Sequence, residues 1–383
     1  MDKIQKGLFF FINGLFVAKY SLRLGYNPFV ALGLYAACAI VVMYLVLKSN
    51  HLPENKAIKI AYLFACISIV AIIALLQSLI NPLQLQVDRW SAIHNFLQNL
   101  FQGIYPYAAK THLGGYGSPF PVWQFFHIPF YLLSNVGLGM VFSVIILFIF
   151  LIRYFRLYRS ALSFLILLII SPAFWYEVAV RSDLIYNFIL CLVAIGWIHK
   201  QKYTIQKQAY GLGILCGLFL STRLAVIIPF AVFLLPDFFA ASPKQKFIFG
   251  LSIAATFVLT FLPFICWNFN ALLFFKYSPF VLQTRQGSVW EVLLLIALTL
   301  FLSSRWKGNL KLCCSSIAVI LVVFVAQTFV HRMINEHFAY NLFSPAYDIT
   351  YFTMALPFVL FAIINKPGFQ FSNQQKVHPN TES

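Results

Sequence analysis

QLQVDRWSAIHNFLQNLFQGIYPYAAKTHLGGYGSPFPVWQFFHIPFYLL, residues 84–133, is the one long stretch between apolar runs that carries a pattern of its own. Over residues 90–104 apolar side chains recur at the spacing of one helical face, with polar residues such as His94 and Gln98 between them. These apolar residues are Trp90, Ile93, Phe96, Leu97, Leu100, Phe101 and Ile104. The pattern predicts an amphipathic helix that lies along a membrane surface.

Asp88 stands at the start of this predicted helix, and an aromatic, glycine-rich loop follows it. The loop contains Tyr105, Tyr107, Gly114, Gly115, Gly117 and the segment SPFP at residues 118–121. An acid at the N-terminus of an interfacial helix, followed by aromatic residues that can stack on a ligand, predicts a functional site in the loop 82–133.

The composition places the chain in a membrane. Of its 383 residues, 61% are hydrophobic and only 10% are charged, against roughly 25% charged in soluble proteins. Apolar runs that approach or reach the roughly 17–25 residues needed to cross a bilayer occupy residues 29–47, 57–80, 136–152, 162–178, 184–198, 209–221, 224–235, 247–266, 289–302, 312–330 and 350–364. The expected fold class is an all-α polytopic membrane protein with about 11–12 transmembrane helices. Residues 1–365 would form one domain, and residues 366–383 a disordered cytoplasmic tail.

Whether the chain has eleven or twelve transmembrane helices depends on whether its amino-terminal segment crosses the membrane. The apolar run 7–17 is short, and Lys3, Lys6, Lys19 and Arg23 flank it on both sides. A first crossing through this run, which we favour, makes twelve helices, whereas an amino terminus on the outer side makes eleven.

Lysines and arginines alternate between the two sides of the chain if the loop 82–133 faces outward. Sixteen then lie in inner connections: Lys48, Lys56, Lys59, Arg153, Arg156, Arg159, Lys200, Lys202, Lys207, Lys244, Lys246, Arg305, Lys307, Lys311, Lys366 and Lys376. Seven lie outside: Arg89, Lys110, Arg181, Arg223, Lys276, Arg285 and Arg332. Since positive residues stay on the cytoplasmic side, this bias predicts a plasma (bacterial inner) membrane protein with its site on the extracytoplasmic face. The net charge of +17 then suits the anionic inner leaflet, and no nucleic acid is expected as a partner.

Other features exclude several function classes. The seven cysteines all fall in or beside apolar runs, so no disulfide framework is expected. Neither a Cys/His cluster with metal-ligand spacing nor a GxxxxGK[ST] motif occurs, which argues against a metalloenzyme of known spacing and an ATP-driven pump. No cofactor is therefore expected; a divalent metal is compatible with the sequence but is not indicated by it.

Six of the ten acidic residues fall on the predicted outer side: Asp88, Glu177, Asp183, Glu291, Glu336 and Asp348. Ionisable groups at the edge of the hydrocarbon are costly and are usually kept for function. Asp88 has two compatible roles, as a cap of the predicted helix and as a catalytic or acceptor-binding acid. Glu177, Arg181 and Asp183 form either a structural ion-pair set at a helix junction or a contact with substrate.

The outer bases leave similar alternatives open. Arg223 follows an apolar run and needs an anionic partner, which is either a phosphate or one of these acids. Lys276 and Arg285 lie in an aromatic loop that suits a phosphate-bearing lipid headgroup or a plain interfacial anchor. Arg332 and His337 belong either to the site or to a solvated helix end.

In these features the chain resembles the type C membrane glycosyltransferases, many-spanning enzymes that take sugar from a polyprenyl-phosphate donor on the extracytoplasmic side. The resemblance rests on the outer-loop acid Asp88, the predicted interfacial helix, GIYPY at residues 103–107 and SPFP at 118–121. It continues with RSDLIYN at 181–187 and GLFLSTRL at 217–224, and covers roughly the first two thirds of the chain. The mannosyltransferase-like members are the nearest analogy.

The resemblance implies transfer of mannose or a similar hexose or pentose to a lipid-linked or cell-envelope glycan, with Asp88 as general base. Family members often carry two adjacent acids in this loop, whereas Arg89 follows Asp88 here. The residues expected to bind substrate are Arg89, Tyr105, Tyr107, Arg181, Asp183, Arg223, Lys276, Arg285, Arg332 and His337. The expected partners are the donor, a glycan or glycolipid acceptor and membrane lipid. The chemistry needs one base for the acceptor hydroxyl and positive charge for the leaving phosphate.

Two other functions fit parts of the same pattern. A transporter or flippase of polyprenyl-linked glycans would also use intramembrane charges and broken helices, but no internal repeat relates the two halves of the sequence. An O-antigen polymerase or ligase would share the polyprenyl-linked substrate and would carry its main outer loop late in the chain.

Overall fold

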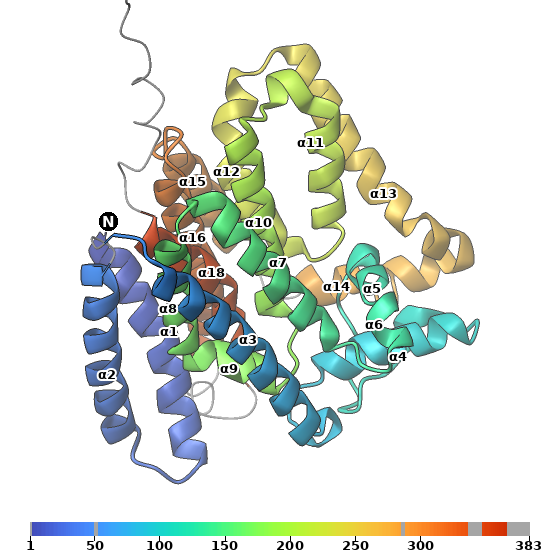
Figure 1. Cartoon of the computed structure of the whole chain (residues 1–383). Coiled ribbons are helices and arrows are strands. Elements are labelled where there is room, and N and C mark those ends of the chain that lie inside the picture. The colour runs from blue at the N-terminus through green and yellow to red at the C-terminus, as the bar shows by residue number, and fades with distance from the viewer. Residues whose placement is uncertain (1, 50–52, 285–287, 336–346, 366–383) are drawn as a thin grey trace, which may run out of the picture.

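The computed structural model describes residues 2–49, 53–284, 288–335 and 347–365. Within these ranges the chain is helical and has no strand, apart from one isolated bridge between Lys110 and Tyr116 (Figure 1). The all-α fold class expected from the sequence is confirmed. The expected tail at 366–383 lies outside the described residues.

Six helices of the described chain are long and apolar enough to cross a membrane. They are α2 (Pro28–Ser49), α3 (Lys56–Leu79), α7 (Leu138–Phe155), α10 (Leu184–Gln201), α13 (Pro243–Leu273) and the segment Leu310–His331 of α16 (Leu310–Asn335). A seventh span results if α8 (Tyr158–Ile169) and α9 (Pro172–Ala179) are counted together, although they meet at a bend of 69°. By helix length and hydropathy the chain is a multi-pass membrane protein.

This number is lower than eleven or twelve because several apolar runs form short helices. These are α11 (Ile205–Leu220), α12 (Ile227–Ala240) with η3 (Leu224–Val226), α15 (Val289–Ser303), and α18 (Leu356–Ile364) with η4 (Ile349–Ala355). All nine residues of α18 are buried. Its ends therefore meet protein rather than lipid, and bilayer thickness does not set its length.

The amino-terminal run 7–17 lies inside α1 (Asp2–Arg23), which is 22 residues long. Figure 1 shows α1 beside α2, and it also packs against α18. A helix therefore precedes the first apolar span of the sequence.

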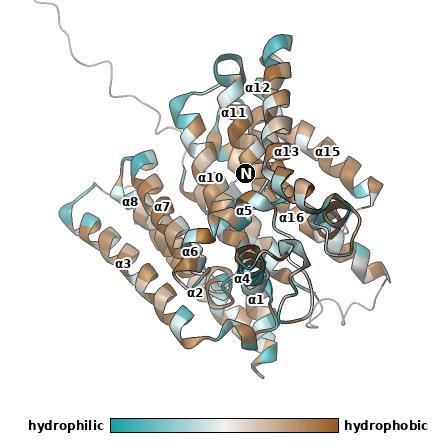
Figure 2. Ribbon diagram, turned by 90° about the vertical axis from the view of Figure 1, so that its right-hand side faces the viewer, coloured by the Kyte–Doolittle hydropathy of each residue, from teal (hydrophilic) through white to brown (hydrophobic). Residues whose placement is uncertain are grey.

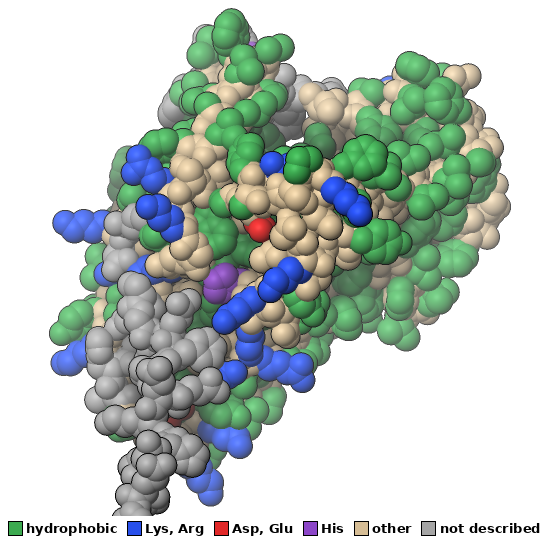
Figure 3. Space-filling view, turned by 90° about the horizontal axis from the view of Figure 1, so that it is seen from above, with side chains coloured by type: hydrophobic (Ala, Val, Ile, Leu, Met, Phe, Trp, Pro, Cys, Tyr) green, Lys and Arg blue, Asp and Glu red, His purple; other side chains and the backbone are tan. Residues whose placement is uncertain are grey.

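The helices bring their connections to two opposite ends of the molecule (Figure 1). The first, called the loop end below, holds residues 80–137, 180–183, 221–226 and the turn after α13. The second, called the basic end, holds the start of α1 and the turns after α7, α10, α12 and α15. Figure 3 looks onto the basic end, where Lys and Arg side chains gather and little acidic surface is visible.

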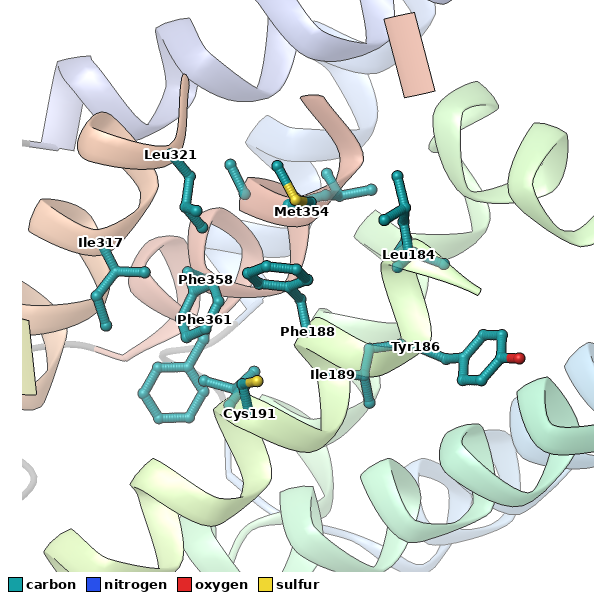
Figure 4. Packing of buried hydrophobic residues seen from close by; sticks show 14 of the residues in the cluster. Leu184, Tyr186, Phe188, Ile189, Cys191, Ile317, Leu321, Met354, Phe358 and Phe361 are labelled. Carbon is teal, nitrogen blue, oxygen red and sulfur yellow. The ribbon is translucent and has the colours of Figure 1, made fainter. Parts of the chain in front are cut away.

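The core of the bundle lies between α10, α16 and the η4–α18 segment. Figure 4 shows Leu184 and Phe188 of α10 facing Met354 and Phe358, and all four side chains are buried. The outer helices instead turn apolar side chains to the surface, as the brown ribbons of α3 and α13 show in Figure 2. Phe64 of α3, for example, is 71% exposed. Such large apolar surfaces are expected of a protein surrounded by lipid.

Two glycines let α11 and α13 approach closely. A Cβ atom at Gly213 would lie 2.5 Å from the Cβ atom of Ser252, and one at Gly217 would lie 2.8 Å from that of Thr256. Small residues four positions apart allow this kind of close helix packing in membranes. The turn 221–226 follows directly after α11 at the loop end.

Candidate active site

The helix α4 (Arg89–Phe101) lies across the loop end rather than along the bundle (Figures 1 and 2). Ile93, Phe96 and Leu97 pack into the protein, whereas Phe101 and Ile104 stay 54% and 50% exposed. The helix ends before Gly103, whose φ of +71° is left-handed. The predicted apolar stripe is therefore divided between protein packing and an exposed patch.

Arg89, the first residue of this helix, is buried. Its guanidinium donates to Ser182 Oγ at 2.9 Å, Asp348 Oδ2 at 2.6 Å and Thr350 Oγ1 at 2.6 Å. It also lies 4.8 Å from the centre of the Tyr351 ring. Because a buried arginine is stable only with an anionic partner, the pair with Asp348 fastens α4 to η4.

A second ion pair joins Arg223 to Asp183. Arg223 Nε and Nη2 lie 3.0 Å and 2.5 Å from Asp183 Oδ2, and Trp123 Nε1 donates to the same oxygen at 2.7 Å. Burial alone would raise the pKa of Asp183, but Arg223 and Arg89 together bring that pKa below its ordinary value. The sequence left open whether the anionic partner of Arg223 is a phosphate or an acid. In the structure its partner is the carboxylate of Asp183. The pairing of Asp183 with Arg181, considered from the sequence, does not occur.

The turn 221–226, which carries Arg223, also holds the SPFP segment in place. Gln283 of α14 (Pro279–Thr284) accepts a hydrogen bond from Leu224 N and donates one to the Ser118 carbonyl, both at 2.6 Å. Phe120 N donates to the Thr222 carbonyl at 3.0 Å. These bonds fix the second half of the loop against the turn that carries Arg223.

Asp88 has very different surroundings. It occupies the N-cap position of α4, but its carboxylate makes no capping hydrogen bond. Asp88 Oδ2 instead accepts a hydrogen bond from Thr111 Oγ1 at 2.7 Å, and the residue is half-buried. Across the described ranges no ion pair with Asp88 is found.

A tight turn brings Thr111 to Asp88. Thr111 N donates to the Gly115 carbonyl and Gly114 N to the Thr111 carbonyl, both at 2.9 Å. Gly114 has a φ of +82°, which favours glycine. A Cβ atom at Gly115 would lie 3.3 Å from Asp88 Oδ2. The two glycines therefore let the turn close over the carboxylate.

An exposed lysine stands beside this turn. Lys276, after α13, places its ammonium 5.9 Å from the centre of the Tyr116 ring. Tyr116 directly follows Gly115 and lies 5.6 Å from the ring of Tyr277. The segment that covers Asp88 thus continues into an aromatic surface with a positive charge on it.

The other residues expected to bind substrate lie elsewhere or deeper. Tyr107 is only 1% exposed and contacts Phe96 and Phe264, so its ring is not open to a sugar. Tyr105 is half-buried between other aromatic rings. Arg181 donates to the carbonyls of Gln77 and Ile80.

Three expected site residues fall wholly or partly outside the described chain. Arg285 and His337 are outside the described residues, and Arg332 lies in α16 without a described side chain.

Two further buried groups sit beneath the loop. Glu177 is fully buried; its Oε2 accepts a hydrogen bond from Ile185 N at 3.2 Å, and Oε1 finds no partner within the described residues. His127 lies between the Trp123 carbonyl and the Tyr186 hydroxyl, each at 2.6 Å. Burial lowers the pKa of His127 to about 4, so the imidazole is neutral at pH 7.

The sequence-based interpretation missed Thr111, Ser182 and Gln283. The glycine pair after Thr111 was a usable signal, because adjacent glycines indicate a turn that folds the chain back. Ser182 and Gln283 gave no such signal, since their partners are far away in the sequence.

No three His, Cys, Asp or Glu side chains gather around a metal position within the residues that the structure describes. Comparison of the chain with known protein families, with characterised proteins and with solved structures finds no match.

Proposed function

We propose that the protein is a membrane glycosyltransferase that moves a sugar from a polyprenyl-phosphate donor to a hydroxyl group of a glycan or glycolipid. Asp88 is its general base. The observation that carries the proposal is the setting of this carboxylate, which is half-buried beside a crosswise amphipathic helix and outside the ion pairs of the described chain. In that place it can meet a lipid-borne donor and a water-borne acceptor.

The geometry of Asp88 suits a base that takes a proton from the acceptor. Thr111 occupies Oδ2, and no hydrogen bond to Oδ1 is made by the described residues. In the reaction, Oδ1 takes the proton of the acceptor hydroxyl while the hydroxyl oxygen bonds to the anomeric carbon. The bond from that carbon to the donor phosphate breaks, and polyprenyl phosphate leaves with the electron pair.

The leaving phosphate needs positive charge. Arg223 is bound to Asp183, so its role in this proposal is to hold the SPFP segment. Lys276 is the described member of the expected phosphate-binding set that reaches the surface beside Asp88, through Tyr116. Its ammonium stabilises the leaving phosphate, and the exposed Phe101 and Ile104 give the prenyl chain an apolar path.

The charge distribution supports one orientation in the membrane. Lysines and arginines gather at the basic end (Figure 3), which the positive-inside rule assigns to the cytoplasm. The loop end, with Asp88, then faces the outside of a plasma membrane, where polyprenyl-linked sugars are consumed in the proposed reaction.

The test is transfer by the purified full chain in nanodiscs, assayed with a panel of polyprenyl-phosphate sugars including the mannose donor. Asp88→Asn keeps the size of the side chain but removes the base, so we expect transfer to fall by about 10² to 10⁴ fold. Donor binding and melting temperature should change little. Glu54→Gln, which removes an exposed carboxylate at the basic end, is the matched control and should transfer normally.

Near-normal transfer by the Asp88→Asn protein would remove Asp88 from this role. If the wild-type protein instead moves a polyprenyl-linked glycan across liposomes without any transfer, a flippase function replaces the proposal.

A further inference from the structure

His112 lies in the turn 111–115 over Asp88, and the reaction proposed above assigns it no role. It directly follows Thr111, whose hydroxyl donates to Asp88 Oδ2. The residue is half-buried, and both nitrogens of its ring lie within hydrogen-bond distance of an oxygen atom. Nδ1 is 2.7 Å from Ser91 Oγ, and Nε2 is 2.9 Å from the Leu85 carbonyl oxygen. The ring therefore bridges the segment before Asp88 and the first turn of α4, which follows Asp88.

Ser91 connects this imidazole to the backbone of Asp88. Ser91 is buried, and its hydroxyl donates to the Asp88 carbonyl at 2.9 Å. The same hydroxyl oxygen accepts a hydrogen bond from the backbone N–H of His112 at 3.2 Å. A serine hydroxyl has one hydrogen and two acceptor positions. Because the Asp88 carbonyl uses the hydrogen, Ser91 meets the imidazole as an acceptor, and Nδ1 must donate.

These contacts decide the protonation state of the His112 ring. The Leu85 carbonyl only accepts hydrogen bonds, so Nε2 must carry a hydrogen as well as Nδ1. Both ring nitrogens of histidine are donors only in the imidazolium form. In a neutral ring with its hydrogen on Nε2, the Ser91 hydroxyl can donate to Nδ1 or to the Asp88 carbonyl, but not to both. The imidazolium is therefore the form that satisfies all of these contacts together.

The charges on the neighbouring segments do not oppose an imidazolium at this place. The titratable groups on residues 84–88, on α4, on residues 110–117 and beside Tyr116 are Asp88, Arg89, His94, Lys110, Tyr116 and Lys276. Arg89 is paired with Asp348, and Lys110 and Lys276 are exposed, where water weakens their charge. Within the described chain, no unpaired buried cation of these segments therefore repels a proton on His112.

We propose that His112, as an imidazolium, is a positioning residue for Asp88. It ties the segment at Leu85 and the turn 111–115 to Ser91, and so keeps Thr111 against the Asp88 carboxylate. Loss of the proton removes one of these hydrogen bonds and loosens the turn. Histidine side chains change charge between about pH 5 and pH 8, so we expect the turn to loosen as the pH rises through this range. The effect on transfer rests on the function proposed above, whereas the effect on the turn does not.

The first measurement is hydrogen–deuterium exchange of the full chain in nanodiscs, which reports opening of the turn without any substrate. Thr111 N and Gly114 N donate within the turn, so peptides that cover residues 108–117 report it. At pH 6 we expect these peptides to exchange about 5-fold faster in His112→Gln, because hydrogen bonds that hold the turn are lost. After correction for intrinsic exchange, wild type should approach the variant at pH 8. His199→Gln, which removes a histidine hydrogen bond at the basic end, is the matched control and should match wild type here.

The second measurement is transfer by the same proteins between pH 6 and pH 8. At pH 6 we expect kcat of His112→Gln to be about 10-fold lower, with an unchanged KM for the donor, because the base is no longer held in place. The ratio of wild-type to variant kcat should fall toward 1 at pH 8, where wild type loses the imidazolium. Ionisation of Asp88 is common to both proteins and cancels in this ratio.

Ser91→Ala tests the same contacts from the other side and serves if His112→Gln does not fold. It removes one buried hydroxyl oxygen and should lower kcat at pH 6 by about 10-fold. The Ser91→Ala/His112→Gln protein should be no slower than either single variant, because both changes remove the same link. Additive losses would mean that the two residues act separately and would overturn the proposal.

Two further results would overturn it. One is unchanged exchange of residues 108–117 in His112→Gln at pH 6. The other is a ratio of transfer rates that stays constant between pH 6 and pH 8, which would mean that the proton on His112 has no effect on Asp88. If wild type transfers no sugar at any pH, the proposed function fails instead, and the exchange measurement alone still decides whether His112 holds the turn.

Discussion

Two groups of carboxylates at the loop end are held in opposite ways. Asp183 and Asp348 belong to what we call the charged floor, Arg89, Asp183, Arg223 and Asp348, in which each acid is paired with an arginine. The carboxylate of Asp88, under the turn 111–115, accepts a hydrogen bond only from a threonine hydroxyl among the described residues, and Asp88 is half-buried. The carboxylates paired with arginines resist protonation because the arginines favour the charged form, whereas an unpaired carboxylate can exchange a proton with a substrate. The comparison separates the acids that hold helices together from the acid that we propose as the base.

The largest stability effect should come from breaking the charged floor. Asp183→Asn leaves the buried Arg223 guanidinium without its counter-charge, which typically costs about 3–5 kcal/mol. We expect the melting temperature in detergent to fall by roughly 10 °C. Asp88→Asn is the control and should melt close to wild type. Equal melting temperatures for the two variants would erase the distinction between the two groups.

The next effect is a pH dependence of stability that comes from His127. Its pKa is about 4 in the folded protein, against an ordinary value of about 6.5. Between these values the unfolded chain binds a proton that the folded chain does not, so acidification favours unfolding. The loss starts below about pH 6.5, grows to about 3 kcal/mol near pH 4, and is absent above pH 6.5.

Melting temperatures measured between pH 4 and pH 8 check this expectation. The His127→Gln protein should lose most of the slope between pH 6.5 and pH 4. Parallel curves for the two proteins would show that another group dominates in this range.

A smaller effect on stability is expected at Thr111, where loss of the hydrogen bond to Asp88 should lower transfer more than it lowers stability. Thr111→Val removes the hydrogen bond to Asp88 Oδ2, which at a half-buried site contributes about 1 kcal/mol or less. Transfer should fall by about 10-fold because the base is no longer held in place. Thr111→Ser keeps the hydroxyl and should restore transfer, whereas failure of both variants alike would point to packing of the turn.

The smallest stability effect is expected at Lys276, which is exposed. Lys276→Gln should leave the melting temperature unchanged and raise the KM for the donor by about 3- to 10-fold at low salt. Because salt screens exposed charges, the difference should shrink at about 0.5 M NaCl. Lys244→Gln, at the basic end, is the matched control. A KM that does not respond to either Lys276→Gln or salt would contradict a role in holding the phosphate.

The sequence by itself determined the helical class and the positions of the long spans. The runs 57–80 and 184–198 became α3 (Lys56–Leu79) and α10 (Leu184–Gln201), with ends that differ by three residues at most. Helix α4 also follows its predicted spacing, although it ends at Phe101. These features depend on apolar length and helical periodicity, which are local properties of the chain.

Only the tertiary structure decided which charges pair and which helices are short. Arg89 finds Asp348 at a separation of 259 residues, and Arg223 finds Asp183 across 40 residues. Neither pairing can be predicted from the local spacing of residues, because each pair forms only when separate helices pack together. The same packing surrounds α18 with protein and frees it from the length that lipid would impose. It also leaves Asp88 half-buried beside Thr111, since the position of the turn 111–115 depends on contacts with α4 that no local pattern specifies.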